Sequence, residues 1–109
     1  MVGPDKTGTI GAAGETNLGE AGSRRVSSWL IQFEDNSFSG SITIKAAAAG
    51  GSNTALAVGY KDMETSAVAT SAITGNRLIL VDSSGCDVQI DCTSYTSGDI
   101  AYTAIPLIG

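Results

Sequence analysis

Between residues 29 and 45 the chain alternates apolar and polar side chains, and this alternation limits the possible folds more than any other feature. The apolar members of the alternation are Trp29, Ile31, Phe33, Phe38, Ile42 and Ile44. A period of two is typical of a β-strand with one buried face. The turn-forming cluster at residues 34–37 predicts that two such strands form an antiparallel hairpin. Because the only Trp and both Phe lie on its inner face, later strands are expected to cover that face.

Further strands are expected along the rest of the chain. They are predicted at residues 54–61, 66–73, 78–81, 86–92 and 99–105, with loops at 46–53 and 93–98 and a strand end at Pro106. The continuous apolar run at 78–81 predicts a central strand covered on both faces. Strands do not alternate with helical patterns. We therefore predict an all-β fold, a jelly-roll-like antiparallel β-sandwich of about seven strands, over residues 26–109.

Residues 1–25 differ from this body. They contain six glycines and only two large apolar side chains after the start of the chain, Ile10 and Leu18, and they follow neither period. The sequence predicts an extended N-terminal arm, which either adds as a strand to another subunit or folds back on its own sheet. Arg24 and Arg25 join the arm to the body, as a solvated or self-paired junction or as an anchor to an acidic neighbour. The candidate partner-binding residues are Lys6, Ile10, Leu18, Arg24 and Arg25.

Charge and hydropathy exclude several partners. The net charge is −5, and all of the excess lies after residue 25, where eight acidic residues face three basic ones. Such a body repels phosphate backbones, so no nucleic-acid partner is expected. No apolar run approaches the roughly 18 residues of a membrane span, so no membrane partner is expected either. The N-terminus lacks the pattern of a signal peptide, which predicts synthesis in the cytoplasm.

The residue types needed for catalysis are scarce. The chain has no histidine, which removes the usual general base and the histidine-based metal sites. Cys86 and Cys92 lie too far apart on one predicted strand to pair with each other, so both are expected to be free thiols. Asp82, Asp87 and Asp91 lack calcium-loop spacing and are interpreted as solvated carboxylates. We therefore expect no enzyme activity, no cofactor and no metal.

Three tyrosines leave a second function open. Tyr60, Tyr95 and Tyr102 could form a platform on which a sugar stacks, or they could be packing residues. The first alternative would suit a carbohydrate- or receptor-binding module.

Four stretches of the body resemble small virion structural proteins of tailed bacteriophages. They are FSGSITIK at 38–45, VDSSGCDV at 81–88, TSYTSG at 93–98 and PLIG at 106–109. The resemblance does not cover the arm, and it transfers no functional residue. It implies a capsid decoration or cement protein, made in the host cytoplasm and located on the capsid surface of the virion. The implied partners are the major capsid protein and further copies of the chain, as a dimer or trimer. Alternatives are a module of a phage fibre or tail that binds a carbohydrate or receptor, and a bacterial surface or pilus-like subunit.

Overall fold

The computed structural model describes residues 5–18, 26–48, 54–83 and 85–108, and it contains only strands, turns and irregular segments there. The strands are β1 (Lys6–Ile10), β2 (Gly14–Asn17), β3 (Val26–Ala48), β4 (Leu56–Ala57), β5 (Tyr60–Asp62), β6 (Ala67–Ala69), β7 (Arg77–Asp82) and β8 (Cys86–Ile108). All of the pairings between them are antiparallel, and they join all eight strands into one sheet. The predicted all-β antiparallel fold is confirmed.

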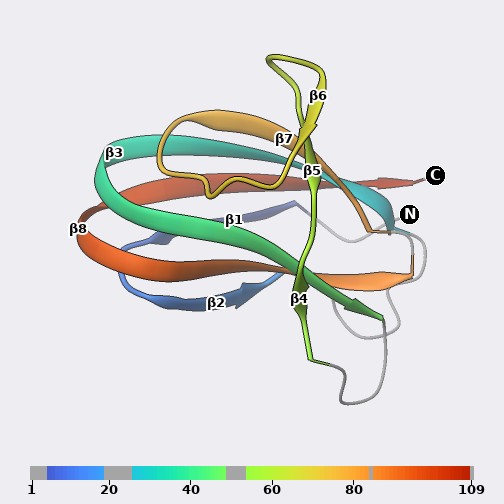
Figure 1. Ribbon diagram of the computed structural model, residues 1–109, viewed down its shortest axis with the longest axis horizontal. Helices are drawn as coiled ribbons and strands as arrows, with labels where there is room; N and C mark the ends of the chain where they lie inside the picture. Colours follow the sequence, from blue (N-terminus) through green and yellow to red (C-terminus); the bar gives the residue numbers. More distant parts are fainter. Residues whose placement is uncertain (1–4, 19–25, 49–53, 84, 109) are drawn as a thin grey trace.

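Two long strands organise this sheet. β3 and β8 each have 23 residues and pair along almost their full length, from Val26 opposite Ile108 to Ala48 opposite Cys86. Both strands curve round and return, so the sheet is folded over on itself (Figure 1). We call the part built on residues 26–36 and 99–108 the first half, with strand order β1-β8-β3-β7-β5-β6. The second half, built on residues 39–48 and 86–97, has β2 beside β8 and β4 beside β3.

The prediction of a hairpin at residues 29–45 is wrong, because these residues belong to the single strand β3. Residues 34–37 do not reverse the chain, because β3 runs through them while staying paired with β8. The pairing shifts register between Asn36 and Ser37 and twice more before residue 42. Such β-bulges bend a strand and increase its twist. The turn-forming residues at 34–37 thus lie at a bend within one strand and do not connect two strands.

The opposite strand bends at the same place. The predicted loop at 93–98 belongs to β8, which also continues past Pro106 to Ile108. Gly98 has φ +74° at this bend, and a Cβ there would overlap the carbonyl group of Ser37. Ser37 itself has a φ of 56°. Glycine is therefore required at residue 98 by the backbone conformation and by the close approach of β3.

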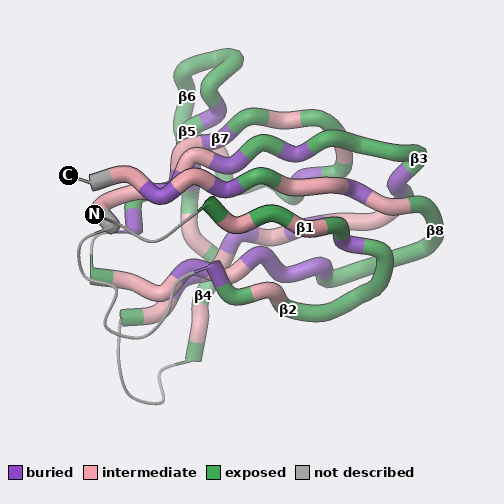
Figure 2. The backbone as a smooth tube through the Cα atoms, turned by 180° about the vertical axis from the view of Figure 1, so that it is seen from behind, coloured by how far each residue is buried: buried purple, intermediate pink, exposed green. Residues whose placement is uncertain are grey.

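The alternation of side chains agrees with the prediction even though the hairpin does not. The inner-face residues of β3 are buried, and Gln32 and Glu34 on the other face are exposed. Figure 2 shows the same alternation along β3 and β8. Both halves contribute to one apolar core, whose members include Trp29, Ile31, Phe33, Ile42, Ile44, Ile79, Val81, Val88, Ile90 and Ile100. The two halves therefore enclose this core between them.

Between residues 54 and 73 the strands are shorter than predicted, whereas β7 extends one residue beyond each end of the predicted strand at 78–81. Leu56, which belongs to the predicted strand at 54–61, is 68% exposed. β7 lies between β3 and β5, as expected of a central strand, but only Ile79 and Val81 face the core. Leu78 and Leu80 lie on the outer face, so the strand is not covered on both sides. The segment β4–β5–β6 crosses from the second half to the first (Figure 1).

The described part of the N-terminal arm lies on its own sheet. β1 pairs with β8 from Lys6 opposite Ala104 to Ile10 opposite Ile100, and β2 pairs with β8 further along. This is the alternative in which the arm folds back. Gly8 belongs to the inner face, where a Cβ would lie 2.7–2.9 Å from the hydroxyl oxygen and two ring carbons of Tyr102. A neighbouring strand thus supplies the apolar cover that the arm's own sequence lacks, which explains why the arm follows neither period.

Candidate interaction surfaces

The two cysteines are free, as predicted, and Cys92 is buried. Its Sγ donates a hydrogen bond to the carbonyl oxygen of Ser94 at 3.3 Å. Burial raises the pKa of the Cys92 thiol, and the negative charge of Asp91 raises it further. A buried, protonated thiol is a poor nucleophile. Among the described residues, no group of three or more His, Cys, Asp or Glu side chains is arranged to hold a metal ion.

Asp91 is not a solvated carboxylate, which corrects the interpretation from sequence. It is buried, and its Oδ2 lies 2.6 Å from Nζ of Lys45 on the neighbouring strand. The hydrogen bond to Asp91 raises the pKa of Lys45, although desolvation opposes the shift, and the charges of Asp91 and Glu15 add to the increase. The pair joins β3 to β8 on the outer side of the second half, so its role is structural.

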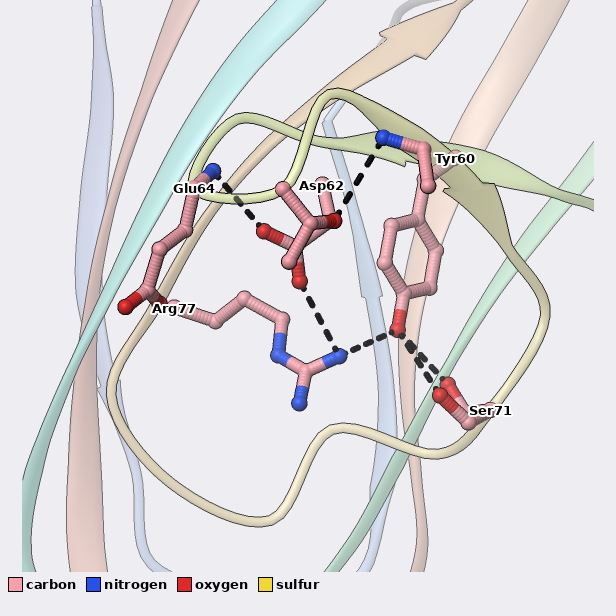
Figure 3. Close-up of polar contacts among 7 residues, drawn as sticks. Tyr60, Asp62, Glu64, Ser71 and Arg77 are labelled. Carbon is pink, nitrogen blue, oxygen red and sulfur yellow. Dashed lines mark hydrogen bonds and ion pairs between the residues drawn. The ribbon is translucent and has the colours of Figure 1, made fainter.

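A second buried carboxylate, Asp62, belongs to a polar network that fastens β5 to β7 (Figure 3). The Tyr60 hydroxyl donates to the carbonyl oxygen of Ser71 at 2.9 Å. Nη1 of Arg77 donates to the same hydroxyl at 2.9 Å and lies 3.5 Å from Oδ2 of Asp62. The other carboxylate oxygen of Asp62 accepts from the backbone N–H of Glu64 at 2.9 Å. The polar atoms of this network thus act as hydrogen-bond or ion-pair partners for one another. The sequence carries no signal for the network, because its members come from separate segments.

The three tyrosines do not form one platform. Tyr60 is buried in the network just described. Tyr102 faces inward and packs against the core. Tyr95 is partly exposed, its hydroxyl donates to the carbonyl oxygen of Gly98 at 2.9 Å, and its ring lies beside that of Phe38. A sugar-stacking surface made of all three is therefore contradicted, and the packing alternative holds for Tyr60 and Tyr102.

The candidate partner-binding residues of the arm divide into two groups. Ile10 and Leu18 are buried in the core of their own chain, so they are not surface residues that a partner could contact. Lys6 is half-buried on β1, and Arg24 and Arg25 lie outside the described residues. Partner binding by these three basic residues stays a prediction.

The arm has two edge strands, because β1 and β2 each pair only with β8 among the described strands, and β1 is the longer of the two. Among the described strands β1 pairs only with β8, so its other side is an edge of the sheet. An edge strand carries a row of backbone N–H and C=O groups that can pair with another chain. Thr7 and Thr9 are the exposed side chains of this strand.

A second surface covers the outer side of the first half. We call it the apolar outer face and define it by Leu30, Met63, Val68, Leu78, Leu80, Ile105 and Leu107. All of these side chains are exposed or half-buried. Leu80 lies opposite Leu30 on β3 and opposite Lys61 on β5, and Lys61 lies opposite Val68. A depression of about 550 Å³ between Val68 and Leu80 opens on this face. The sequence indicates the apolar outer face only indirectly, because apolar residues occupy both faces of the segments 29–31 and 78–81.

A second depression, of about 520 Å³, is polar and lies near the bend of β3. One of its acidic lining residues, Asp35, is already used locally. Asp35 accepts a hydrogen bond from the backbone N–H of Phe38 at 2.6 Å, and Asn76 accepts one from the N–H of Asp35 at 2.6 Å. This depression therefore supports the bend of β3.

Comparison with known proteins shows a shared fold. No protein-family model matches the chain, and no curated protein matches its sequence. Among solved structures, the crystal structure of the SPBc2 prophage-derived protein YomS matches with a TM-score of 0.62. The match covers 95% of each chain at 14% sequence identity. The chain thus has the fold of a prophage-derived protein.

No described helix is long and apolar enough to cross a membrane.

Proposed function

We propose that this chain is a non-enzymatic structural protein of a bacteriophage virion, and more specifically a capsid decoration or cement protein. Likeness in fold to a prophage-derived protein over nearly the whole chain supports the phage origin. The net charge of −5 suits the outside of a DNA-filled shell better than its interior. In this proposal the chain is made in the host cytoplasm and located on the capsid surface.

The observation that carries the proposal is the free edge of β1. A strand of the major capsid protein could pair with this edge, so that main-chain hydrogen bonds provide the attachment. Five residues of pairing make a modest contact, but many copies on one shell reinforce it collectively. Attachment through the edge replaces attachment through Ile10 and Leu18, which the core already uses.

Co-sedimentation with shells tests this proposal. The purified chain is mixed with mature capsids, procapsids and tails of the phage that encodes it, and the pelleted chain is quantified. We expect saturable binding to shells at a fixed copy number and a higher melting temperature of the loaded shells. Binding to tails or fibres with none to either kind of shell would overturn the decoration role.

Point variants of β1 locate the attachment. Removing residues 2–25 would also remove Ile10 and Leu18 from the core, so substitutions are preferable to deletion. Thr7→Lys combined with Thr9→Lys places two charges on the edge strand, a device that blocks strand pairing. We expect it to weaken shell binding at least tenfold. Thr103→Lys is the matched control, because Thr103 lies opposite Thr7 on β8 and is also exposed. Equal binding by both variants would show that the edge is not the attachment site.

A further inference from the structure

The outer sides of the two halves differ in chemistry. On the second half, the outward residues of β2, β8 and β3 are polar, as with Asn17, Gln89 and the ion pair of Lys45 and Asp91. On the first half, one row crosses five strands and carries Val68, Lys61, Leu80, Leu30 and Ile105 in that order. Four of the five side chains in this row are apolar. The sheet therefore has one polar outer side and one apolar outer side.

The apolar outer face is exposed as well as continuous. Val68 is 79% exposed, and Met63 and Leu78 are each more than a third exposed. Met63 lies beside Leu78, since its backbone N–H donates to the carbonyl oxygen of Leu78 at 2.9 Å. Single exposed apolar residues are ordinary, but a contiguous patch marks an interaction surface.

The size of the face sets the strength of the contact. Five strands at about 4.8 Å spacing give a width of about 20 Å, and five residues of β7 give a length of about 13 Å. The face thus covers on the order of 300 Å², within the range of patches that are often functional. A standard interface buries about 800 Å² on each partner. A contact through this face is accordingly weak, with a dissociation constant above about 1 μM.

Charge indicates which partner fits. The chain carries a net charge of −5, so two copies repel each other over most of their surfaces. The depression on the apolar outer face is lined by one base, Lys61, and one acid, Asp82, so the lining of this depression carries no net charge. A second copy brings the same two groups. A two-fold axis parallel to the sheet can then place each Lys61 opposite the Asp82 of the other copy.

We infer that the apolar outer face is the surface through which two copies of this chain associate, face to face about a two-fold axis. The contact would form the dimer that the resemblance to virion structural proteins implies, and it goes beyond the proposed function, which needs only attachment to a shell. It does not depend on the shell, because it uses the outer side of the sheet while shell attachment uses the edge of β1. Self-association and shell binding can therefore fail separately.

Analytical ultracentrifugation of the full chain tests the inference over chain concentrations from about 10 μM to about 1 mM, which bracket a weak contact. As the chain concentration increases, we expect the average mass of the particles in solution to rise from 11.0 kDa toward twice that value. The rise should persist in high salt, because burial of apolar area drives it. A chain that stays at 11.0 kDa throughout the range would overturn the inference.

Two sets of variants identify the face and the occupant. Val68→Lys with Leu78→Lys should raise the dissociation constant at least tenfold. Leu56→Lys is the matched control, because Leu56 is 68% exposed but lies on β4, outside the face. For the charges, Lys61→Glu should weaken association, and adding Asp82→Lys should restore it, because the exchanged groups can again lie opposite each other across the two-fold axis.

Other outcomes count against the inference. If Leu56→Lys weakens association as much as the double variant, the face is not the interface. If the double variant abolishes co-sedimentation with shells while the unmodified chain is monomeric at every concentration, the face binds a capsid protein instead of a second copy. A monomer that still binds shells refutes only the dimer, and a dimer that binds no shell refutes only the decoration role.

Discussion

Truncation of Leu18 measures whether the N-terminal segment belongs to the core. Leu18 follows β2, is 1% exposed, and donates its backbone N–H to the carbonyl oxygen of Val88 at 2.9 Å. Leu18→Ala removes three buried carbons, which at about 0.8 kcal/mol each cost about 2.4 kcal/mol. The cavity that remains raises the loss to about 3 kcal/mol, within the range of about 2–5 kcal/mol measured for such changes.

Urea unfolding followed by the fluorescence of Trp29, the only tryptophan and a core residue, measures this loss. With a slope of about 1.5 kcal/mol per molar urea, the midpoint should fall by about 2 M. Asn17→Ala is the control, because Asn17 is the preceding residue and is exposed. It should change the free energy of unfolding by less than about 0.5 kcal/mol. If Leu18→Ala moved the midpoint no further than Asn17→Ala, the N-terminal segment would not be part of the core.

Three further predictions concern the bend, the ion pair and the buried thiol. Gly98→Ala should cost about 3 kcal/mol or more, whereas Gly85→Ala, with a similar φ of +75° but no atom within 4 Å of the added Cβ, should cost only the conformational strain of about 1–2 kcal/mol. Equal losses in urea unfolding would refute the predicted clash at the bend. Because the hydrogen bond to Asp91 raises the pKa of Lys45, the pair's contribution is complete below the ordinary lysine pKa and is lost as pH rises through the higher folded pKa. Lys45→Arg keeps its charge in base, so between pH 8 and pH 11 it should lose less stability than the unmodified chain, and equal losses would contradict this reasoning. Since burial raises the pKa of Cys92, its thiol should resist an aromatic disulfide reagent at pH 8 in the folded protein and react in urea. Cys92→Ala should therefore leave the thiol signal of the folded protein unchanged, and a fall in that signal would show that Cys92 is accessible.

The inner faces of the strands were predictable because burial of one face imposes a period of two. Trp29, Ile31 and Phe33 alternate with polar or less buried neighbours, and the structure buries all three. The same reasoning identified the strand after Cys86 and the free state of both cysteines. These features depend on short stretches of sequence, where local periodicity carries the information.

The bend and the arm were not predictable in this way. Residues 34–37 have the composition of a turn, and strands usually have only five or six residues, so a strand of 23 residues is not the expected interpretation. Whether such residues reverse the chain or bend it depends on β8, which lies far away in the sequence. Gly8 likewise gives no apolar signal, because the ring of Tyr102 fills its place on the inner face.

The apolar outer face was visible in sequence but was misinterpreted. Leu78 and Leu80 suggested a strand covered on both faces, which would be correct if another layer packed on them. In the structure the residues that flank β7 come from β3 and β5 at its edges. Periodicity shows that a side chain is apolar, but it does not show whether its own chain or another molecule covers it.

The pairing of β8 with β1, β2 and β3 also determines when the protein can acquire its structure. A ribosome produces those three strands well before the one that joins them, and the pairing of Lys6 with Ala104 closes a loop of nearly the whole chain. Proteins dominated by such distant pairings fold slowly, in milliseconds to seconds. Until β8 is made, the apolar side of β3 has no cover, and a chaperone could bind it. The nascent chain therefore passes through an aggregation-prone interval before its sheet can close.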